Sequence, residues 1–437
     1  MNSFEYRGEW WLAKDEEEER VAGILEFDPN DGDELELIGA FDDIGHTRSR
    51  EVDVINGEIT NGKVITLQDC FINHSGGSST LQTQSCKVGM IFTNVLFSEN
   101  NFELEKVCVS FPLLEMWTAT NTVHRPEGQI IGAEISEFET KEARLNNATI
   151  RLNITQSTQQ QEWKGIELTQ QAYFYIELDE PDSFDVYLND YIRHLQHFIC
   201  LAVDEPVTPV DLTGYYEEDG QTHTTDIVYQ VSNLPEVPDK KHPNRVQFYL
   251  HDINFEVALQ NWFEDAEGAE MLHNLYFGTQ YNENMFQEYS FFSLVIALEH
   301  YQSYLFPNHR LMNKDEYDDL HKQIRETMPD DAAAKDRINN LLRSIGNKGS
   351  LHDQLSMVLY EYEDILGDLT DIEQMVRDAK NNRHTIAHGL DNDYNINELS
   401  DTAEKLQVAV EVILLKVVRL DPDHIKKKLK KNRRHKL

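Results

Sequence analysis

Three side chains that can do chemistry stand close together in the segment "NNRHTIAHGL", residues 381–390. Arg383, His384 and His388 fall within six positions and immediately precede Gly389. A histidine can take the proton of a ribose 2′-hydroxyl, and an arginine can stabilise the charge that develops on the attacked phosphate. These residue types therefore suit cleavage of RNA by transesterification, without a metal ion.

The position of Arg383 on a predicted helix is more informative than its spacing from the histidines. We expect a helix over 371–388, starting at a capping box of Thr370 and Glu373 and stopping at Gly389. Its apolar face carries Arg383 in line with Ile372, Met375, Val376, Ala379 and Ile386. A guanidinium in a core position needs an acidic partner or a ligand, because an unpaired buried charge is strongly destabilising.

His388 falls in the last turn of this helix, where the carbonyl ends favour its protonated form while Arg383 opposes it. An arginine followed by a histidine after four to six residues occurs four times, at Arg245/His251, Arg377/His384, Arg383/His388 and Arg419/His424. Of the four arginines, only Arg383 lies on the apolar face of this helix. One copy supplies too few groups for both an acid and a base, so we expect a two-fold homodimer that brings two motifs together.

A metal site is the alternative interpretation of the same residues. His384 and His388 are four positions apart on a helix, a spacing that suits zinc or iron. Asp391 is close in sequence, but there is no HExxH pattern and no local third ligand. His194 and His197 raise the same question, and a structural or surface role is favoured for them. We therefore expect no cofactor.

The composition indicates a folded protein of several domains. The chain has 437 residues, 40% of them hydrophobic, with a formal net charge of −39. No apolar run is long enough for a membrane span, the start lacks a secretory signal, and Cys70, Cys86, Cys108 and Cys200 show no metal-binding spacing. These features predict a cytoplasmic protein with reduced thiols and no membrane contact.

The last residues, 426–437, form a basic tail in this acidic chain. Phosphate contact depends on a local positive patch, so the tail could bind RNA; equally, it could be a disordered solubilising end. The candidate RNA contacts are Lys426, Lys427, Lys428, Lys430, Lys431, Arg433 and Arg434.

Short strands are predicted over most of residues 1–255. Segments such as "RVAGILEFD", "KVITLQDCFI", "FELEKVCVSF", "AYFYIEL" and "RVQFYLHDI" are rich in β-branched and aromatic residues. They indicate a β-sandwich or a barrel-like domain, interrupted by one helix over 184–203. Residues 256–425 instead repeat apolar positions at helical spacing, which predicts an antiparallel bundle. The fold class is therefore α+β, a β-rich sandwich-like domain followed by helices.

Both regions also resemble known families. The bundle with "NNRHTIAHG" resembles a HEPN domain, whose ribonucleases carry Arg, a polar residue, a few further residues and then His, and "FFSLVIALEHYQSYLF" resembles its first long helix. The segments "GEWWLA", "VAGILEFDPNDGDELELIGAF", "VINGEITNGKVITLQDCF" and "LLEMW" follow the order of the ApeA N-terminal domain. Together the two resemblances cover nearly the whole chain.

The resemblance implies an anti-phage abortive-infection protein, in which a sensing or regulatory domain controls a dimeric, metal-independent endoribonuclease. By position, Arg383 would hold the scissile phosphate and His388 would be the acid or base. His384 fills the polar place, as a second proton carrier or a hydrogen-bond partner. Glu299, on the first long helix, could orient a histidine or anchor Arg383, or simply be exposed or form a salt bridge.

A non-catalytic role is the other prediction from the same resemblance. HEPN domains can be scaffolds, and this acidic chain could contact a basic phage protein or be neutralised by an antitoxin. For the nuclease, a cellular RNA with exposed bases, such as a tRNA anticodon loop, is the expected target. The sequence names neither that RNA nor the phage-encoded trigger.

Overall fold

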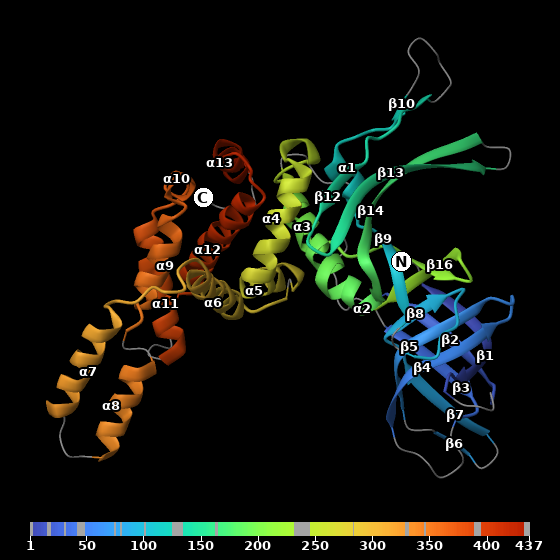
Figure 1. Ribbon diagram of the computed structural model, residues 1–437, viewed down its shortest axis with the longest axis horizontal. Coiled ribbons are helices and arrows are strands. Elements are labelled where there is room, and N and C mark those ends of the chain that lie inside the picture. The colour runs from blue at the N-terminus through green and yellow to red at the C-terminus, as the bar shows by residue number, and fades with distance from the viewer. Residues whose placement is uncertain are drawn as a thin grey trace. The chain divides into compact units, whose positions relative to one another are not determined.

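The computed structural model describes residues 3–14, 19–29, 32–41, 49–73, 76–78, 81–99, 102–124, 134–161, 165–230, 245–282, 284–327, 332–344, 347–388 and 395–431. The chain forms two compact units, Met1–Phe263 and Glu264–Leu437. The first is rich in strands and the second is helical (Figure 1). The predicted α+β class is therefore confirmed.

A closed antiparallel barrel forms the beginning of the first unit. Its strands follow the order β5-β4-β1-β2-β3-β7, and pairing of β7 with β5 closes the ring. Alternate residues point inward, so Trp10, Leu25, Leu35 and Leu67 are almost fully buried. The strands are β1 (Phe4–Leu12), β2 (Val21–Asp28), β3 (Gly32–Ile38), β4 (Arg50–Ile59), β5 (Val64–Ile72) and β7 (Leu81–Lys87), with β6 (Gly76–Ser78) on the edge of β7.

The sheet continues beyond the barrel from β5 into a second layer, in the order β8-β16-β15-β9-β14-β13-β12. These strands are β8 (Met90–Thr93), β9 (Glu103–Ser110), β12 (Lys141–Arg144), β13 (Ala148–Gln161), β14 (Gly165–Ser183), β15 (Asp211–Glu218) and β16 (Gln221–Tyr229). β10 (Val123–His124) and β11 (Glu134–Ile135) pair separately. The sandwich-like expectation is thus refined to a barrel with a strand extension.

Helices cover the extension. α1 (Leu114–Thr118) supplies Trp117, and the predicted helix over 184–203 is present as α2 (Phe184–Val186), a π-helical turn (Tyr187–Ile192) and α3 (Arg193–Val203). The buried Phe198 of α3 packs edge-on against Trp117, at 5.7 Å between ring centroids, and against Trp262 at 5.6 Å. Trp262 belongs to α4 (Phe255–Gly268). These aromatic contacts form the second core of the unit.

The predicted strand over 245–253 is wrong. Residues 246–249 have no regular secondary structure and 250–252 form a 3-10 turn, with Val246, Gln247 and Phe248 all buried. The segment packs on a helix and not on a sheet edge: the Gln247 amide donates to the Ala202 carbonyl at 2.8 Å, and Phe248 contacts Phe198. A β-branched and aromatic composition indicates a buried segment, but does not show whether a strand lies alongside.

The helical unit is built around α6 (Gln287–Leu305), which contacts α5, α9, α11 and α12. Leu294, Leu298, Leu359 and Ile413 are buried in its core. Its other helices are α5 (Glu270–Tyr281), α7 (Lys314–Thr327), α8 (Ala332–Ser344), α9 (Leu351–Tyr360), α10 (Glu363–Leu366), α11 (Ile372–His388), α12 (Ile396–Val417) and α13 (Pro422–Lys431). Asn395 caps α12 by accepting from the Asn397 amide at 3.0 Å. None of the described helices is both long and apolar enough to cross a membrane.

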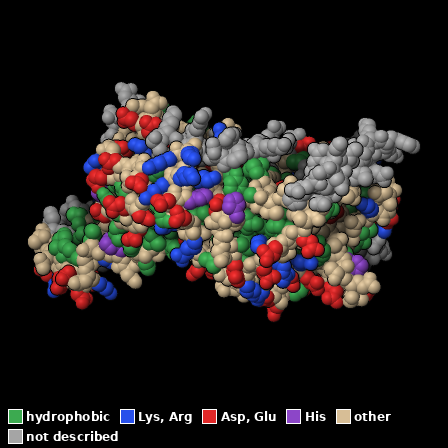
Figure 2. Space-filling model, turned by 90° about the horizontal axis from the view of Figure 1, so that it is seen from above, with side chains coloured by type: hydrophobic (Ala, Val, Ile, Leu, Met, Phe, Trp, Pro, Cys, Tyr) green, Lys and Arg blue, Asp and Glu red, His purple; other side chains and the backbone are tan. Residues whose placement is uncertain are grey.

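The basic tail begins as a helix, which corrects the expectation of a disordered end for residues 426–431. Ile425 and Leu429 of α13 are fully buried, so an apolar face docks the helix on the bundle. Figure 2 shows Lys and Arg side chains gathered over α13, with acidic side chains beside them. Lys426 pairs with Asp368 at 2.8 Å, and this carboxylate raises the pKa of the lysine. Arg433 and Arg434 lie outside the described residues.

Candidate functional site

α11 begins one residue later than predicted, with Asp371 as its cap. The Asp371 carboxylate accepts from the Gln374 amide at 2.9 Å, whereas the Thr370 amide bonds back to the Leu366 carbonyl. The predicted capping box at Thr370 is therefore wrong, because the Thr370 amide belongs to the preceding turn and Asp371 is the residue that caps the helix. The apolar face is confirmed at its beginning, where Met375 and Val376 are fully buried.

Arg383 lies where α11 leaves the core. Its side chain is 36% exposed, and Nη1 donates to Oε1 of Glu299 on α6 at 3.1 Å. Glu299 is 22% exposed, so solvent screens the pair only in part. The acidic partner that the sequence argument required is thus Glu299, the carboxylate considered as an anchor. A guanidinium has five N–H donors, so one bond to Glu299 leaves others for a phosphate.

A second contact, to α12, fixes the same turn of α11. The side-chain amide of Asn382 donates to the Thr402 hydroxyl of α12 at 3.0 Å. Thr402 is buried and itself donates to the Glu398 carbonyl at 2.7 Å. Because α6 and α12 each hold α11 beside Arg383, the position of the arginine is set by the bundle.

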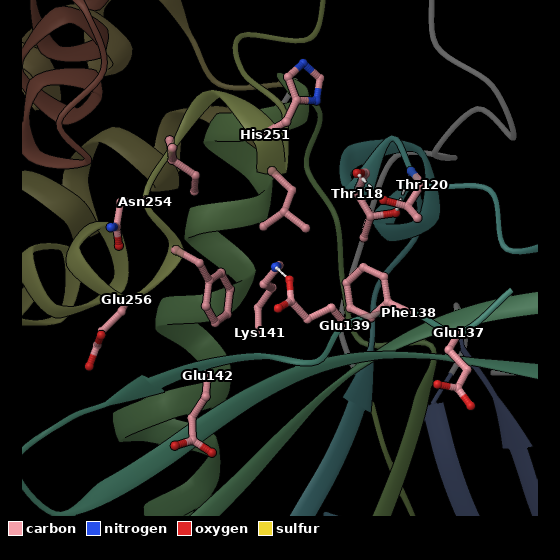
Figure 3. A pocket seen from close by; sticks show the side chains of 13 residues that line it. Thr118, Thr120, Glu137, Phe138, Glu139, Lys141, Glu142, His251, Asn254 and Glu256 are labelled. Atoms are coloured by element: carbon pink, nitrogen blue, oxygen red, sulfur yellow. Dashed lines mark hydrogen bonds and ion pairs between the residues drawn. The ribbon is translucent and has the colours of Figure 1, made fainter.

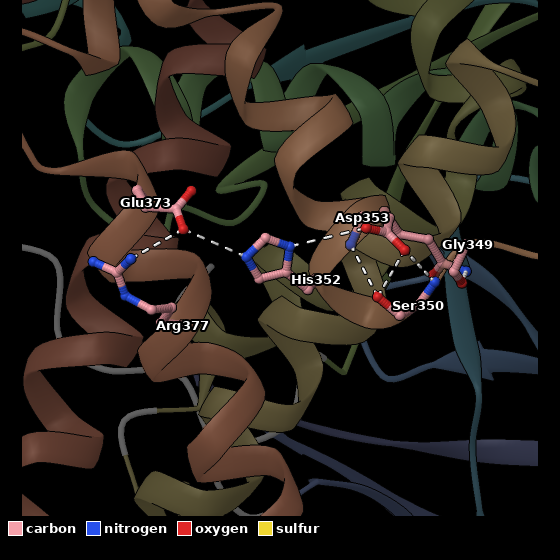
Figure 4. A network of polar contacts seen from close by, with 7 residues as sticks. Gly349, Ser350, His352, Asp353, Glu373 and Arg377 are labelled. Carbon is pink, nitrogen blue, oxygen red and sulfur yellow. Dashed lines mark hydrogen bonds and ion pairs between the residues drawn. The ribbon is translucent and has the colours of Figure 1, made fainter. Parts of the chain in front are cut away.

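A polar network joins the beginning of α11 to α9 (Figure 4). Glu373 accepts from Arg377 at 3.0 Å and lies 3.7 Å from Nε2 of His352. Ser350 caps α9 through Asp353, whose carboxylate accepts from the Ser350 amide and hydroxyl, each at 2.8 Å. These donors, with His352 and His309 nearby, lower the pKa of Asp353. The network therefore joins the beginning of α9 to the beginning of α11 through charged and polar side chains.

The structure describes only some of the other predicted site residues. His384 is exposed on α11 beside Arg383. His388 is the last residue of the helix, and its side chain and Gly389 lie outside the described residues. The lysines of α13 follow the far end of α12, a 22-residue helix about 33 Å long. The structure therefore brings Arg383 and Glu299 together, and places the basic helix away from them.

A cavity of about 470 Å³ adjoins Glu299 in the same unit. It lies between the end of α6, the loop 306–310 and residues 348–354. Its cationic side chains are Arg310 and Lys348, and His300 and His309 also line it. The sequence analysis missed this set, because the three segments meet only through packing of α6 against α9, and no spacing signals that.

The first unit contains a cavity of its own, of about 580 Å³. Its apolar lining includes Phe138 and Phe255, and its rim is acidic, with Glu137, Glu139, Glu142 and Glu256. Figure 3 shows the ion pair between Lys141 and Glu139 within this cavity. Across the described residues, no group of three or more His, Cys, Asp or Glu side chains is arranged to hold a metal.

Two family models match the chain in the order of its two units. The model described as ApeA N-terminal domain 1 matches residues 5–262, more than half of the chain. The model described as Apea-like HEPN matches residues 292–424, which include α6, α11 and Arg383. No curated protein and no solved structure gives a significant match. The predicted resemblance to both domains is confirmed, and the chain belongs to the ApeA family, with an ApeA N-terminal domain followed by an Apea-like HEPN domain.

Proposed function

We propose that this protein is a metal-independent endoribonuclease that acts in anti-phage defence by abortive infection. One observation carries the proposal: in an Apea-like HEPN domain, a half-exposed arginine is held by a carboxylate at the open end of α11. The same turn carries His384, and the helix ends on His388. An oriented guanidinium beside histidines is the equipment that RNA transesterification needs.

In the proposed reaction, the ribose 2′-oxygen attacks the adjacent phosphorus while a histidine, assigned as His388, accepts its proton. The bond from phosphorus to the 5′-oxygen breaks, and that oxygen receives a proton from an acid, either the partner copy's histidine or His384. Arg383 stabilises the negative charge on the pentavalent phosphorus centre. The products are a 2′,3′-cyclic phosphate and a 5′-hydroxyl.

We assign the first unit a sensing or regulatory role and the second unit the cleavage. The expected substrate is a cellular RNA with unpaired bases, such as a tRNA anticodon loop, because unpaired bases and their 2′-hydroxyls are accessible. The active form is a homodimer, and the expected trigger is a phage-encoded protein.

The proposal is tested by incubating the purified full chain with cellular RNA in EDTA. Arg383→Ala and His388→Ala should each lower the cleavage rate at least about 100-fold, the scale of losing one transition-state donor or proton carrier. Arg377→Ala is the matched control, since Arg377 lies on the same helix but pairs with Glu373. Sequencing of RNA ends after induction, wild type beside His388→Ala, identifies the target. Undiminished cleavage by both active-site variants would refute the proposal.

The second candidate is a non-catalytic interaction module, and the cavity of the first unit favours it. An apolar lining with four glutamates at the rim suits a basic protein segment that inserts a hydrophobic side chain. If the protein is such a module, RNA should stay intact under inducing conditions. A stable protein partner should bind the wild type and no longer bind the Glu142→Lys/Glu256→Lys variant. Cleavage by wild type and not by Arg383→Ala excludes it as the sole function.

A further inference from the structure

We propose that the cavity lined by α6, the loop 306–310 and residues 348–354 binds a neighbouring nucleotide of the RNA whose scissile phosphate is held by Arg383. The proposal rests on the ribonuclease function and adds the binding site that positions the strand. The volume of about 470 Å³ is in the range of sites for small ligands such as a nucleotide.

The cations of this cavity have no acidic partner. Arg310 and Lys348 are both exposed and, within the described residues, neither forms an ion pair. Nη1 of Arg310 donates to the His309 carbonyl at 2.6 Å, which orients the guanidinium without neutralising it. In a chain of net charge −39, two adjacent cations without acidic partners form a local positive site, as an anion requires.

The carboxylates near the cavity are already engaged. Glu299 lines it but accepts from Arg383, and Asp353 accepts from Ser350 at the beginning of α9. Asp353 also lies near His309, which helps to lower its pKa. Neither carboxylate is therefore a counter-ion for Arg310 or Lys348, and an external phosphate fits that place.

The two segments that carry these cations are fastened to each other. The Asn347 side chain accepts from the Met312 amide and donates to the Met312 carbonyl, each at 3.0 Å. The Leu311 amide also donates to the Asn347 carbonyl at 3.3 Å. The two backbone segments that carry Arg310 and Lys348 are thus joined before any ligand arrives.

The remaining lining matches a base. Phe306 and Pro307 supply apolar surface beside the cations, and aromatic side chains bind unpaired bases by stacking. Glu299 connects the cavity to the candidate site, since one of its oxygens holds Arg383. A strand with one phosphate on Arg383 can therefore place an adjoining nucleotide in the cavity.

The test compares Arg310→Ala/Lys348→Ala with wild type in the full chain, on a short single-stranded oligonucleotide. We expect KM to rise about 10-fold or more and kcat to change little, because the cations bind a part of the strand that does not react. Lys322→Ala/Arg325→Ala removes the same charge from the exposed face of α7 and should leave KM unchanged.

Binding separates failure of this inference from failure of the nuclease. In a His388→Ala background, anisotropy of a labelled oligonucleotide is followed against salt. Losing this phosphate contact should lower the log–log salt slope by roughly 0.7. An unchanged KM and salt slope in the folded double variant overturn the inference, even if wild type cleaves RNA. If wild type cleaves nothing, the nuclease proposal fails, and the salt slope still decides whether the cavity binds RNA.

Discussion

At the scale of single residues, the Arg383–Glu299 pair separates what could be predicted from what could not. An arginine in line with Met375 and Val376 is visible in the sequence, and so is its need for a partner. The partner lies 84 positions away among 78 acidic residues, and only the packing of α6 against α11 selects it. Arg310 and Lys348 show no such anomaly, because neither lies on an apolar helix face, and nothing in their spacing marks them as a pair.

Glu299 should act as a positioning residue for Arg383. Glu299→Ala leaves the guanidinium without a carboxylate, so kcat should fall about 10- to 100-fold, the equivalent of one charge-assisted hydrogen bond. Glu299→Gln keeps an acceptor and should recover part of the loss, with KM little changed in both. If Glu299 instead competes with the phosphate, Glu299→Ala would cleave faster than wild type, and steady-state kinetics on one oligonucleotide would show it.

Asp33 should make the stability of the barrel depend on pH. It is 5% exposed, its oxygens have no hydrogen-bond partner among the described residues, and burial raises its pKa to about 7. The unfolded carboxyl has a pKa near 3.8, so it ionises first as pH rises. The protonated folded form is therefore favoured below pH 4, and this contribution, on the order of 4 kcal/mol, is lost between pH 4 and pH 7.

Asp33→Asn removes that titration, so its unfolding free energy should vary less between pH 4 and pH 7 than that of wild type. All five tryptophans, at positions 10, 11, 117, 163 and 262, belong to the first unit, so tryptophan fluorescence reports unfolding there alone. Glu36→Gln, on the outer face of the same strand, is the control and should keep the wild-type slope. Parallel curves for wild type and Asp33→Asn would contradict the prediction.

At the scale of elements, the hydrophobic pattern predicted well which segments are helices or strands and which of their residues are buried. It predicted poorly which elements pack against each other. The helix at α11 and the strands β5 and β9 follow from periodicity alone. Closure of the barrel by β7 on β5 does not, because pairing between strands is set by tertiary contacts. The segment 245–253 has the composition of a strand yet packs on α3, and the basic run of α13 forms a helix that docks on the bundle through its two buried apolar residues, Ile425 and Leu429.

Two glycine substitutions should change stability in opposite directions. Gly57 on β4 pairs with Trp10 on β1, and a Cβ there would overlap the buried indole ring. Gly57→Ala should destabilise the barrel by about 1–3 kcal/mol, seen as a lower midpoint of unfolding followed by tryptophan fluorescence.

Gly278 is exposed on α5 with open space around it, so Gly278→Ala should stabilise the bundle by about 1 kcal/mol, measured by circular dichroism. A destabilising Gly278→Ala would show that the glycine has another role.

At the scale of the whole molecule, the two units divide the proposed work, and the helix geometry of α11 is the reason that we propose a second copy. Position 388 follows position 383 by five residues, which is about 140° around a helix of 3.6 residues per turn. Positions about 140° apart face different sides of a helix, so we propose that the arginine and the histidine acting on one phosphate come from two copies. A two-fold axis can bring Arg383 of one copy to the His388 position of the other.

This arrangement is tested by mixing two inactive chains. Arg383→Ala and His388→Ala should each be dead as homodimers, whereas their heterodimer contains one composite site with both residues intact. Co-expression at equal levels gives half heterodimers, so with His384 as the acid, cleavage should return to about a quarter of the wild-type rate. If arginine and histidine act within one copy, no heterodimer has a complete site and the mixture stays inactive. A mixture of His388→Ala with His388→Ala/Arg377→Ala is the control, because it lacks the histidine in every copy and should never recover.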